Sequence, residues 1–173
     1  MKSDYYMNFV IHETKGRCDM TPIIEHKNAF SNLIKDLIKP FKKEKIDKIV
    51  ALDALGFVLG SAMANKLGTG LVLARKGGKL PRKQKNLFKQ SFIDYTKTKK
   101  YFEISKSAIK NGEKILIVDE WIETGAQIKA VINLVKKAKG QIIGICVLSS
   151  EKNPKTKILF EKYNLKTIRT FER

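Results

Sequence analysis

The sequence has little of several residues that would define a class of protein. Its 173 residues include two cysteines, two histidines, four prolines and one tryptophan. Cys18 and Cys146 lie far apart, and the sequence has no CxxC pair or His/Cys cluster, so neither a disulfide framework nor a zinc site is expected. No apolar run approaches the roughly 20 residues that a membrane-spanning helix needs, so no membrane partner is expected.

The N-terminal stretch MKSDYYMNFVIHETK also lacks the features of a secretory signal, because Asn8 interrupts its apolar residues and no small-residue cleavage site follows. We therefore expect a cytoplasmic protein with reduced thiols. Acidic residues are scarce as well: 17 Asp and Glu stand against 35 Lys and Arg, giving a formal net charge of +18. This balance favours an anionic partner such as a nucleotide, polyphosphate or nucleic acid, although a lysine-rich solvated surface would explain it equally well.

The chain does contain a regular alternation of short apolar segments and amphipathic segments, with no internal repeat or linker, so we expect one domain over residues 1–173. Residues 5–14 are β-prone. Residues 28–41 have helical spacing, with Asn28 able to cap the helix and Pro40 ending it. Further along the chain, the pattern predicts strands at 48–53, 71–74, 114–119, 141–150 and 165–171, and helices at 56–68 and 126–139 and after Pro154.

Strands that are apolar throughout and alternate with helices are typical of the α/β class. We expect a Rossmann-like, open, mostly parallel and twisted sheet with helices on both faces. Such sheets bind ligands beyond the carboxyl ends of their strands. Residues 76–100 break the pattern, because they are rich in lysine and arginine and contain Gly77, Gly78 and Pro81. This stretch is expected to form a long, mobile basic loop or a hairpin.

The segment ILIVDEWIETGAQI, residues 115–128, carries the strongest chemical signal. Asp119 and Glu120 stand where the predicted strand emerges, and residues 124–127 open the next helix. A helix start favours an anion such as phosphate, and Gly125 lets the backbone approach closely. The two acids could accept hydrogen bonds from neighbouring sugar hydroxyls. A single acid at a strand end often only caps the next helix, but the combination predicts a sugar-phosphate site.

A P-loop nucleoside triphosphatase also has an apolar strand that ends in Asp-Glu, where it holds a metal. That function requires a GxxxxGK[ST] loop. The two glycine-containing candidates, GFVLGS and GGKLP, both fail to match it. We therefore set this alternative aside.

The segment ILIVDEWIETGAQ resembles the signature of type I phosphoribosyltransferases, in which an apolar strand leads to two acids, three variable residues and Thr-Gly-Gly-Thr or a close variant. Residues 49–81 resemble the adenine phosphoribosyltransferase branch of that family. Residues 17–37, RCDMTPIIEHKNAFSNLIKDL, resemble its Phe-Arg-Asp-Ile-Ser-Pro opening. The three segments occur in the family's order and together cover residues 16–150.

The resemblance implies transfer of 5-phosphoribose from 5-phosphoribosyl-1-pyrophosphate to a nucleobase, with a purine expected, release of pyrophosphate, and a role in purine salvage. It implies Mg²⁺ as cofactor without direct metal ligands from the protein, and a homodimer.

The resemblance also implies the site residues. Ribose would be held by Asp119 and Glu120. The 5-phosphate would be held by Glu123, Thr124, Gly125, Ala126 and Gln127. Pyrophosphate would lie near Asp53, Ala54, Leu55, Gly56, Arg75, Lys76 and Lys79. An N-terminal hood, residues 1–27, would supply the base pocket with Arg17 and Cys18, and Asp94 best matches the acid that assists the base.

The sequence departs from the family pattern at several of these positions. Leu55 stands where the family has the arginine of Ser-Arg-Gly, and a lost charge-assisted contact of about 1.5–3 kcal/mol would lower activity roughly tenfold to a hundredfold. Ala126 and Gln127 replace Gly-Thr, and Glu120 replaces the second Asp. Arg17 stands in place of the aromatic residue expected over adenine, and it suits a base that bears carbonyl or carboxylate oxygens.

Two hypotheses remain. We favour an active enzyme of altered base preference. The alternative is a catalytically weak relative that binds a ribose phosphate or nucleotide as a sensor, with the positive charge serving nucleic acid. Trp121 either covers the sugar or anchors its loop.

Overall fold

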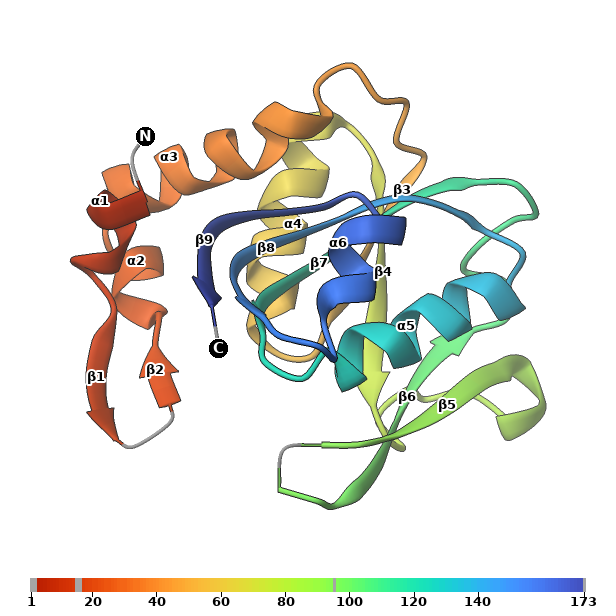
Figure 1. Ribbon diagram of the computed structural model, residues 1–173. Coiled ribbons are helices and arrows are strands. Elements are labelled where there is room, and N and C mark those ends of the chain that lie inside the picture. The colour runs from red at the N-terminus through yellow and green to blue at the C-terminus, as the bar shows by residue number, and fades with distance from the viewer. Residues whose placement is uncertain (1–2, 15–16, 95, 173) are drawn as a thin grey trace. The chain divides into compact units, whose positions relative to one another are not determined.

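The computed structural model describes residues 3–14, 17–94 and 96–172, and it divides into two compact units, Met1–Lys42 and Lys43–Arg173. Each unit is described by itself. Figure 1 shows the order of the elements along the chain. Within the described ranges, every helix is too short or too polar to cross a bilayer.

The first unit contains α1 (Ser3–Met7), β1 (Ile11–Thr14), β2 (Arg17–Asp19), α2 (Thr21–Glu25), α3 (Lys27–Ile38) and the 3₁₀ turn η1 (Lys39–Phe41). Strands β1 and β2 are antiparallel. The predicted helix is confirmed as α3: its apolar stripe is buried, and it gives way to η1 just before Pro40. The unit extends past the predicted 1–27 segment because α3 packs on α2.

Two predictions for the first unit were wrong. Residues 3–7 form a helix rather than part of a strand, because Tyr6 is fully buried there and its hydroxyl donates to Asp36 Oδ2 at 2.6 Å. The cap of α3 is His26 rather than Asn28, since His26 Nδ1 accepts a hydrogen bond from the Ala29 amide at 3.2 Å.

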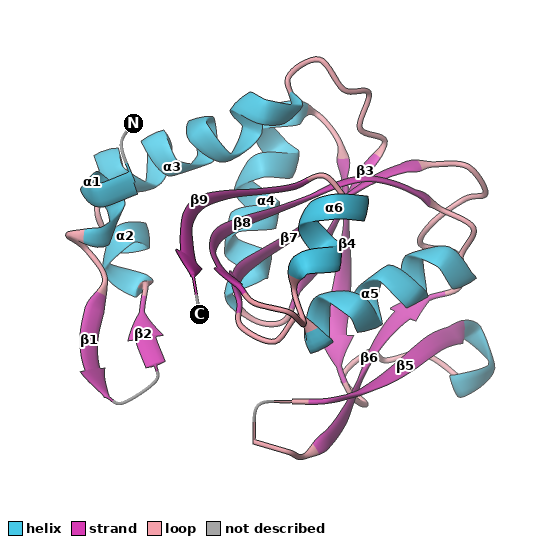
Figure 2. Cartoon of the chain, in the orientation of Figure 1, coloured by secondary structure: helices cyan, strands magenta, loops and turns pink. Residues whose placement is uncertain are grey.

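The second unit is a seven-stranded sheet with the strand order β5-β6-β4-β3-β7-β8-β9 (Figure 2). Strands β4, β3, β7, β8 and β9 are parallel, and β5 and β6 are antiparallel to their neighbours. The predicted α/β class with a mostly parallel sheet is confirmed. The elements are β3 (Lys48–Leu52), α4 (Leu55–Leu67), β4 (Gly70–Lys76), η2 (Gln84–Asn86), β5 (Leu87–Ile93), β6 (Lys99–Ser105), β7 (Lys114–Ile122), α5 (Ala126–Lys137), β8 (Gln141–Lys152), α6 (Lys157–Lys162) and β9 (Leu165–Glu172).

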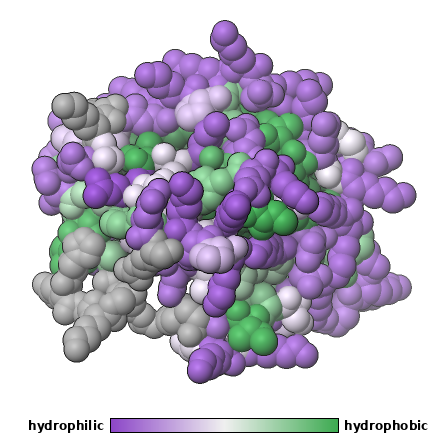
Figure 3. Space-filling view, viewed as in Figure 1, coloured by the Kyte–Doolittle hydropathy of each residue, from purple (hydrophilic) through white to green (hydrophobic). Residues whose placement is uncertain are grey.

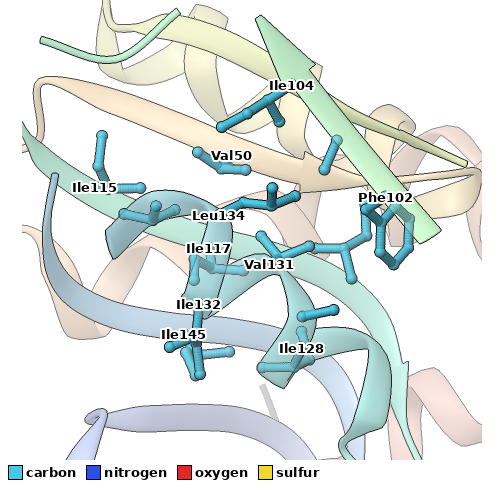
Figure 4. Packing of buried hydrophobic residues seen from close by; sticks show 14 of the residues in the cluster. Val50, Phe102, Ile104, Ile115, Ile117, Ile128, Val131, Ile132, Leu134 and Ile145 are labelled. Atoms are coloured by element: carbon cyan, nitrogen blue, oxygen red, sulfur yellow. The ribbon is translucent and has the colours of Figure 1, made fainter. Parts of the chain in front are cut away.

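Helices α4 and α5 cover opposite faces of this sheet (Figure 1). Because side chains alternate along a strand, Ile115 and Ile117 of β7 face α5, where they pack with Val131 and Leu134 (Figure 4). Each large apolar side chain buried in this way contributes roughly 1.5–3 kcal/mol. On the other face, α4 approaches β3 so closely that a Cβ added to Gly60 would lie 2.6 Å from the Ala51 Cβ.

The basic segment 76–100 forms a short loop and most of a hairpin. β5 pairs with β6 from Leu87↔Ser105 to Ile93↔Lys99, and β6 joins the sheet beside β4. The hairpin alternative is therefore confirmed. Sequence reasoning did not identify β6 as a strand, because its apolar signal is limited to the buried Phe102 and Ile104 and is interrupted by an acid.

Candidate active site at the carboxyl edge of the sheet

The two acids of the 115–128 motif lie where neighbouring strands end at different heights. β3 pairs with β7 only as far as Ala51↔Val118, whereas β7 continues beside β8 to Ile122↔Ser150. Asp119 and Glu120 are therefore inside β7 rather than just after it: Asp119 is level with Leu52, the last residue of β3, and Glu120 lies beyond it. From β3 the strand order runs to β4 on one side and to β7 on the other, and open parallel sheets bind ligands at such a switch point.

Asp119 is almost fully buried, with 5% of its surface exposed. Its Oδ1 accepts a hydrogen bond from the Glu120 amide at 3.0 Å, and a Cβ on Gly56 would lie 2.9 Å from the same oxygen, so the start of α4 rests against this carboxyl. Burial, followed by repulsion from Glu120, raises the pKa of Asp119, while Lys76 opposes the shift. Ionisation of Asp119 therefore lowers the stability of the folded protein.

Glu120 is half-buried, and its Oε2 is shielded from solvent without a hydrogen-bond partner in the described part of the chain. An unsatisfied buried acceptor costs about 1–3 kcal/mol, which a ligand hydroxyl would recover. Together with Asp119, it forms an acceptor pair suited to two neighbouring hydroxyl groups.

A group of cations surrounds Asp53 at the ends of β3 and β4. Asp53 Oδ2 lies 3.6 Å from both Arg75 Nε and Lys79 Nζ, and it accepts a hydrogen bond from the Lys76 amide at 3.3 Å. Arg75 Nε is buried and has no hydrogen-bond partner within the described residues. Two basic side chains, Arg75 and Lys79, lie against this one carboxylate and leave a local excess of positive charge, which suits a multiply charged anion.

Residues 54–56, which were predicted to lie near pyrophosphate, come directly after Asp53 in the sequence. Ala54 is the N-cap of α4, Leu55 is its first residue, and the Asp53–Ala54 peptide bond is cis. Leu55 thus lies beside the cation group but contributes no charge to it.

Residues 123–125 form the turn between β7 and α5, and Ala126 and Gln127 begin the helix. Gly125 is the N-cap of α5 and has a φ of +75°, a conformation that favours glycine. Thr124 Oγ1 accepts a hydrogen bond from the Ala126 amide at 3.3 Å, and the amides of the first helical turn have no acceptor within the helix. Ala126 is the first residue of α5, where the helical backbone accommodates its methyl group. A helix start of this kind favours an anion.

Sequence reasoning missed the residues that support this turn. Asn153 Nδ2 donates to the Glu123 carbonyl at 3.0 Å, and Lys129 Nζ donates to the Lys155 carbonyl at 2.6 Å. A Cβ on Gly125 would lie 3.1 Å from Leu159 Cδ1, so the turn also rests on α6. The available signal was the Asn-Pro pair after β8, which was interpreted only as the start of a helix.

Glu103 was also missed, because it is a single acid in a short aromatic strand. It is fully buried, and its Oε1 accepts a hydrogen bond from the Leu80 amide at 2.9 Å. Lys89 Nζ lies 3.8 Å from its other oxygen. Glu103 therefore holds the loop that carries Lys79 against the hairpin.

Asp94 lies at the turn of the β5–β6 hairpin. Its Oδ1 accepts hydrogen bonds from the Thr96 amide (2.9 Å), the Thr96 hydroxyl (2.6 Å) and the Thr98 amide (3.2 Å), and its Oδ2 pairs with Lys100. The bond from Lys100, followed by that from Thr96, lowers the pKa of Asp94 well below its usual range. This carboxylate is thus engaged in the hairpin turn, and the structure does not bring it together with Asp119.

Three predicted positions remain: Trp121, Arg17 and Cys18. Trp121 stacks on Phe171 of β9, with ring centroids 5.3 Å apart, which supports an anchoring role. Arg17 and Cys18 lie in β2 of the first unit, and their role in a base pocket stays a prediction.

Comparison with known proteins agrees with this geometry. The family model for the phosphoribosyl transferase domain matches residues 22–172. The adenine phosphoribosyltransferase of Brachyspira hyodysenteriae is 36% identical over 162 residues, which cover 92% of this chain and 93% of that protein. The Thermotoga maritima enzyme of the same name is 35% identical over 150 residues, which cover 87% of this chain and 84% of that protein.

Solved structures give the same result. The adenine phosphoribosyltransferase of Thermoanaerobacter pseudethanolicus superposes with a TM-score of 0.88 at 27% identity, covering 98% of this chain and all of that one. The Giardia lamblia enzyme in complex with 9-deazaadenine has a TM-score of 0.88 at 25% identity, covering 100% of this chain and 99% of that one. The chain therefore belongs to the type I phosphoribosyltransferase family and lies in its adenine phosphoribosyltransferase-like branch.

Proposed function

We propose that the protein transfers 5-phosphoribose from 5-phosphoribosyl-1-pyrophosphate to a purine base and releases pyrophosphate. One observation supports this most directly: the acceptor pair, the open helix start and the cation group all belong to the carboxyl ends of the parallel strands β7, β3 and β4. These three features match the hydroxyls, the 5-phosphate and the pyrophosphate of that substrate. Family membership supplies the reaction class.

In this proposal, Asp119 and Glu120 accept hydrogen bonds from the ribose hydroxyls, and the amides that open α5 hold the 5-phosphate. Negative charge accumulates on pyrophosphate as its bond to the ribose C1 breaks. Arg75, Lys76 and Lys79 stabilise that charge, and fixed cations contribute most when they need no rearrangement during the reaction. The base nitrogen then bonds to C1 and gives up its proton.

Mg²⁺ is the cofactor that we propose, on the basis of the donor groups present. The described residues contain no cluster of three His, Cys, Asp or Glu side chains that could form a metal cage. Mg²⁺ usually keeps several of its waters and binds to substrate phosphates. In this proposal it would enter the site on the pyrophosphate of the substrate, without direct ligands from the protein, so that Asp119 and Glu120 stay free to hold the ribose. The ion would neutralise charge on the departing pyrophosphate.

Several finer features stay predictions. Adenine is the first base to test, because the relatives above carry that name, although Arg17 favours a base with oxygen substituents. A homodimer is also proposed. The face in Figure 3 is largely hydrophilic, as expected for a lysine-rich surface, and this does not single out a nucleic-acid groove.

Pyrophosphate release tests the proposal directly. The protein is incubated with Mg²⁺, 5-phosphoribosyl-1-pyrophosphate and adenine, hypoxanthine or guanine in turn. We expect release with at least one of these bases and none without a base. If no base supports turnover but ribose 5-phosphate raises the melting temperature, the sensor hypothesis replaces this one.

Leu55→Arg should restore a cation to the pyrophosphate side of the site. We expect the KM for 5-phosphoribosyl-1-pyrophosphate to fall about tenfold to a hundredfold, as one charge-assisted hydrogen bond of about 1.5–3 kcal/mol would allow. Leu55→Gln is the neutral control and should change KM little. Equal KM values for the arginine and glutamine variants would show that residue 55 does not face the pyrophosphate.

Asp94→Asn separates a structural role from a catalytic one. Because its folded-state pKa is lowered, Asp94 stabilises the fold above its unfolded pKa, and this contribution is lost as pH falls through the folded pKa. We expect the variant to melt at a lower temperature at pH 7 with an almost unchanged kcat at 25 °C. Lys100→Met, which removes the partner, should behave similarly. A large fall in kcat with an unchanged melting temperature would instead assign Asp94 to the reaction.

A further inference from the structure

We propose that Asn153 is a positioning residue for the 5-phosphate of the substrate, acting through the backbone of the 123–125 turn. The inference rests on the proposed function, because it deepens the role of that turn. Asn153 lies outside the sequence motif, in the connection between β8 and α6, and it makes the one hydrogen bond to the Glu123 carbonyl that the described residues show.

The Asn153 side chain uses both ends of its amide. Its Oδ1 accepts hydrogen bonds from the Lys155 amide at 3.0 Å and the Thr156 amide at 3.1 Å, and its Nδ2 donates to the Glu123 carbonyl at 3.0 Å. The first two bonds form a local turn. The third bond reaches a segment 30 residues away in sequence. One side chain thus joins a rigid turn to a loop at the candidate site.

The turn that holds Asn153 is itself well fixed. Thr156 is fully buried, its hydroxyl donates to the Glu151 carbonyl at 2.7 Å, and the same hydroxyl accepts from the Asn153 amide at 3.0 Å. The methyl side of Thr156 and Leu159 lie beneath Gly125. This buried support gives Asn153 a defined position from which to orient Glu123.

The orientation of the Glu123 carbonyl also fixes the direction of the next backbone N–H, that of Thr124. In a trans peptide, the carbonyl and the following N–H point in opposite directions. Because Asn153 holds the Glu123 oxygen, the N–H of Thr124 must point away from the 153–156 turn. The Glu123 carbonyl oxygen, which would repel a phosphate, is at the same time hydrogen-bonded to Asn153 Nδ2. Asn153 therefore keeps a donor, rather than an acceptor, available to the anion.

Binding of ribose 5-phosphate, measured by calorimetry, tests this role with matched variants. Asn153→Asp keeps the oxygen that accepts from the local turn but replaces the donor to Glu123 with a second oxygen. Lys155→Gln changes the charge by the same amount in the same turn and leaves the backbone carbonyl of residue 155 in place. Asn153→Ser removes the Nδ2 group that reaches the Glu123 carbonyl, leaves a shorter hydroxyl in the local turn, and does not change the charge.

We expect Asn153→Asp and Asn153→Ser to weaken ribose 5-phosphate binding about threefold to tenfold more than Lys155→Gln does, which corresponds to one neutral hydrogen bond. In turnover assays, the KM for 5-phosphoribosyl-1-pyrophosphate should rise by the same factor, with the KM for the base unchanged. A purely structural role would lower the melting temperature without separating the two KM values, and that result would overturn the inference.

Failure of the inference can be distinguished from failure of the proposed function. If the unmodified protein binds ribose 5-phosphate and releases pyrophosphate, but the Asn153 variants bind as Lys155→Gln does, only the positioning role is overturned. If the unmodified protein neither binds the sugar phosphate nor turns over, both proposals fail.

Discussion

Asp119→Asn should lower kcat/KM on the order of a hundredfold at pH 7 and, at the same time, raise the melting temperature. The loss of activity follows because hydrogen bonds to a charged acceptor contribute about 1.5–3 kcal/mol each, and the variant replaces one of the carboxylate oxygens that we propose hold the ribose with an amide nitrogen, which cannot accept. The gain in stability follows because Asp119 is buried beside Glu120, so its ionised form is unfavourable in the folded protein.

The pH dependence of the melting temperature checks the stabilising half of this prediction. The folded-state pKa of Asp119 is raised, so the unmodified protein loses stability as pH rises from the unfolded pKa, near 3.9, through the folded pKa. The amide of the Asp119→Asn variant cannot ionise, so the difference in melting temperature should be absent in acid and should grow as pH rises. A variant that is less stable than the unmodified protein at pH 7 would contradict this account.

Asp47→Asn is the control for a change of acid to amide. Asp47 accepts a hydrogen bond from the Lys114 amide at 2.8 Å, at the amino end of β7 and therefore at the opposite edge of the sheet. We expect its kcat/KM to match that of the unmodified protein. If both variants lost activity equally, the loss would not be specific to the carboxyl edge.

Gly60→Val should destabilise the fold by about 1–3 kcal/mol, because the new side chain has no space between α4 and β3. Even its Cβ would lie 2.6 Å from the Ala51 Cβ, so the helix would have to move away from the strand. A loss of that size lowers the melting temperature of a chain this long by roughly 2–4 °C per kcal/mol. Because Gly56, in the same helix, rests against Asp119, ribose 5-phosphate binding should weaken as well.

Gly70→Val is the matched control for the Gly60 variant. A Cβ on Gly70 would meet only the flexible side chain of Lys48, at 3.2 Å or more. Thermal denaturation should therefore place this variant within about 0.5 kcal/mol of the unmodified protein. Equal melting temperatures for the two valine variants would show that α4 can shift without cost.

Most of the second unit could be predicted from the sequence because its signals are local. Gly68 ends α4, Gly125 begins α5, and β3 and the first half of β7 contain continuous apolar runs. At residues 3–7, where the sequence analysis predicted part of a strand, a distant partner decided the structure. The helix at residues 3–7 depends on the burial of Tyr6 and its bond to Asp36, which no local pattern reveals.

The candidate site also has a part that could be predicted from the sequence and a part that could not. The acids, the glycine and the cations could be placed together because parallel strands bring their carboxyl ends to one edge. Asn153 and Glu103 could not be predicted, since each acts through a single hydrogen bond to the backbone of a segment far away in sequence. Asp94 had the expected residue type, and its three local hydrogen bonds became visible only in the folded hairpin.

The order of the strands leaves β9 at one open margin of the sheet. Its sequence interleaves Lys166, Arg169 and Glu172 with apolar residues, and charged side chains on such a margin disfavour docking of a strand from another molecule. Extension of the sheet into fibrillar aggregates is thereby opposed, and the net charge of +18 adds repulsion between molecules. Added salt screens that repulsion beyond about 10 Å at 0.1 M, so resistance to aggregation should decline as ionic strength increases.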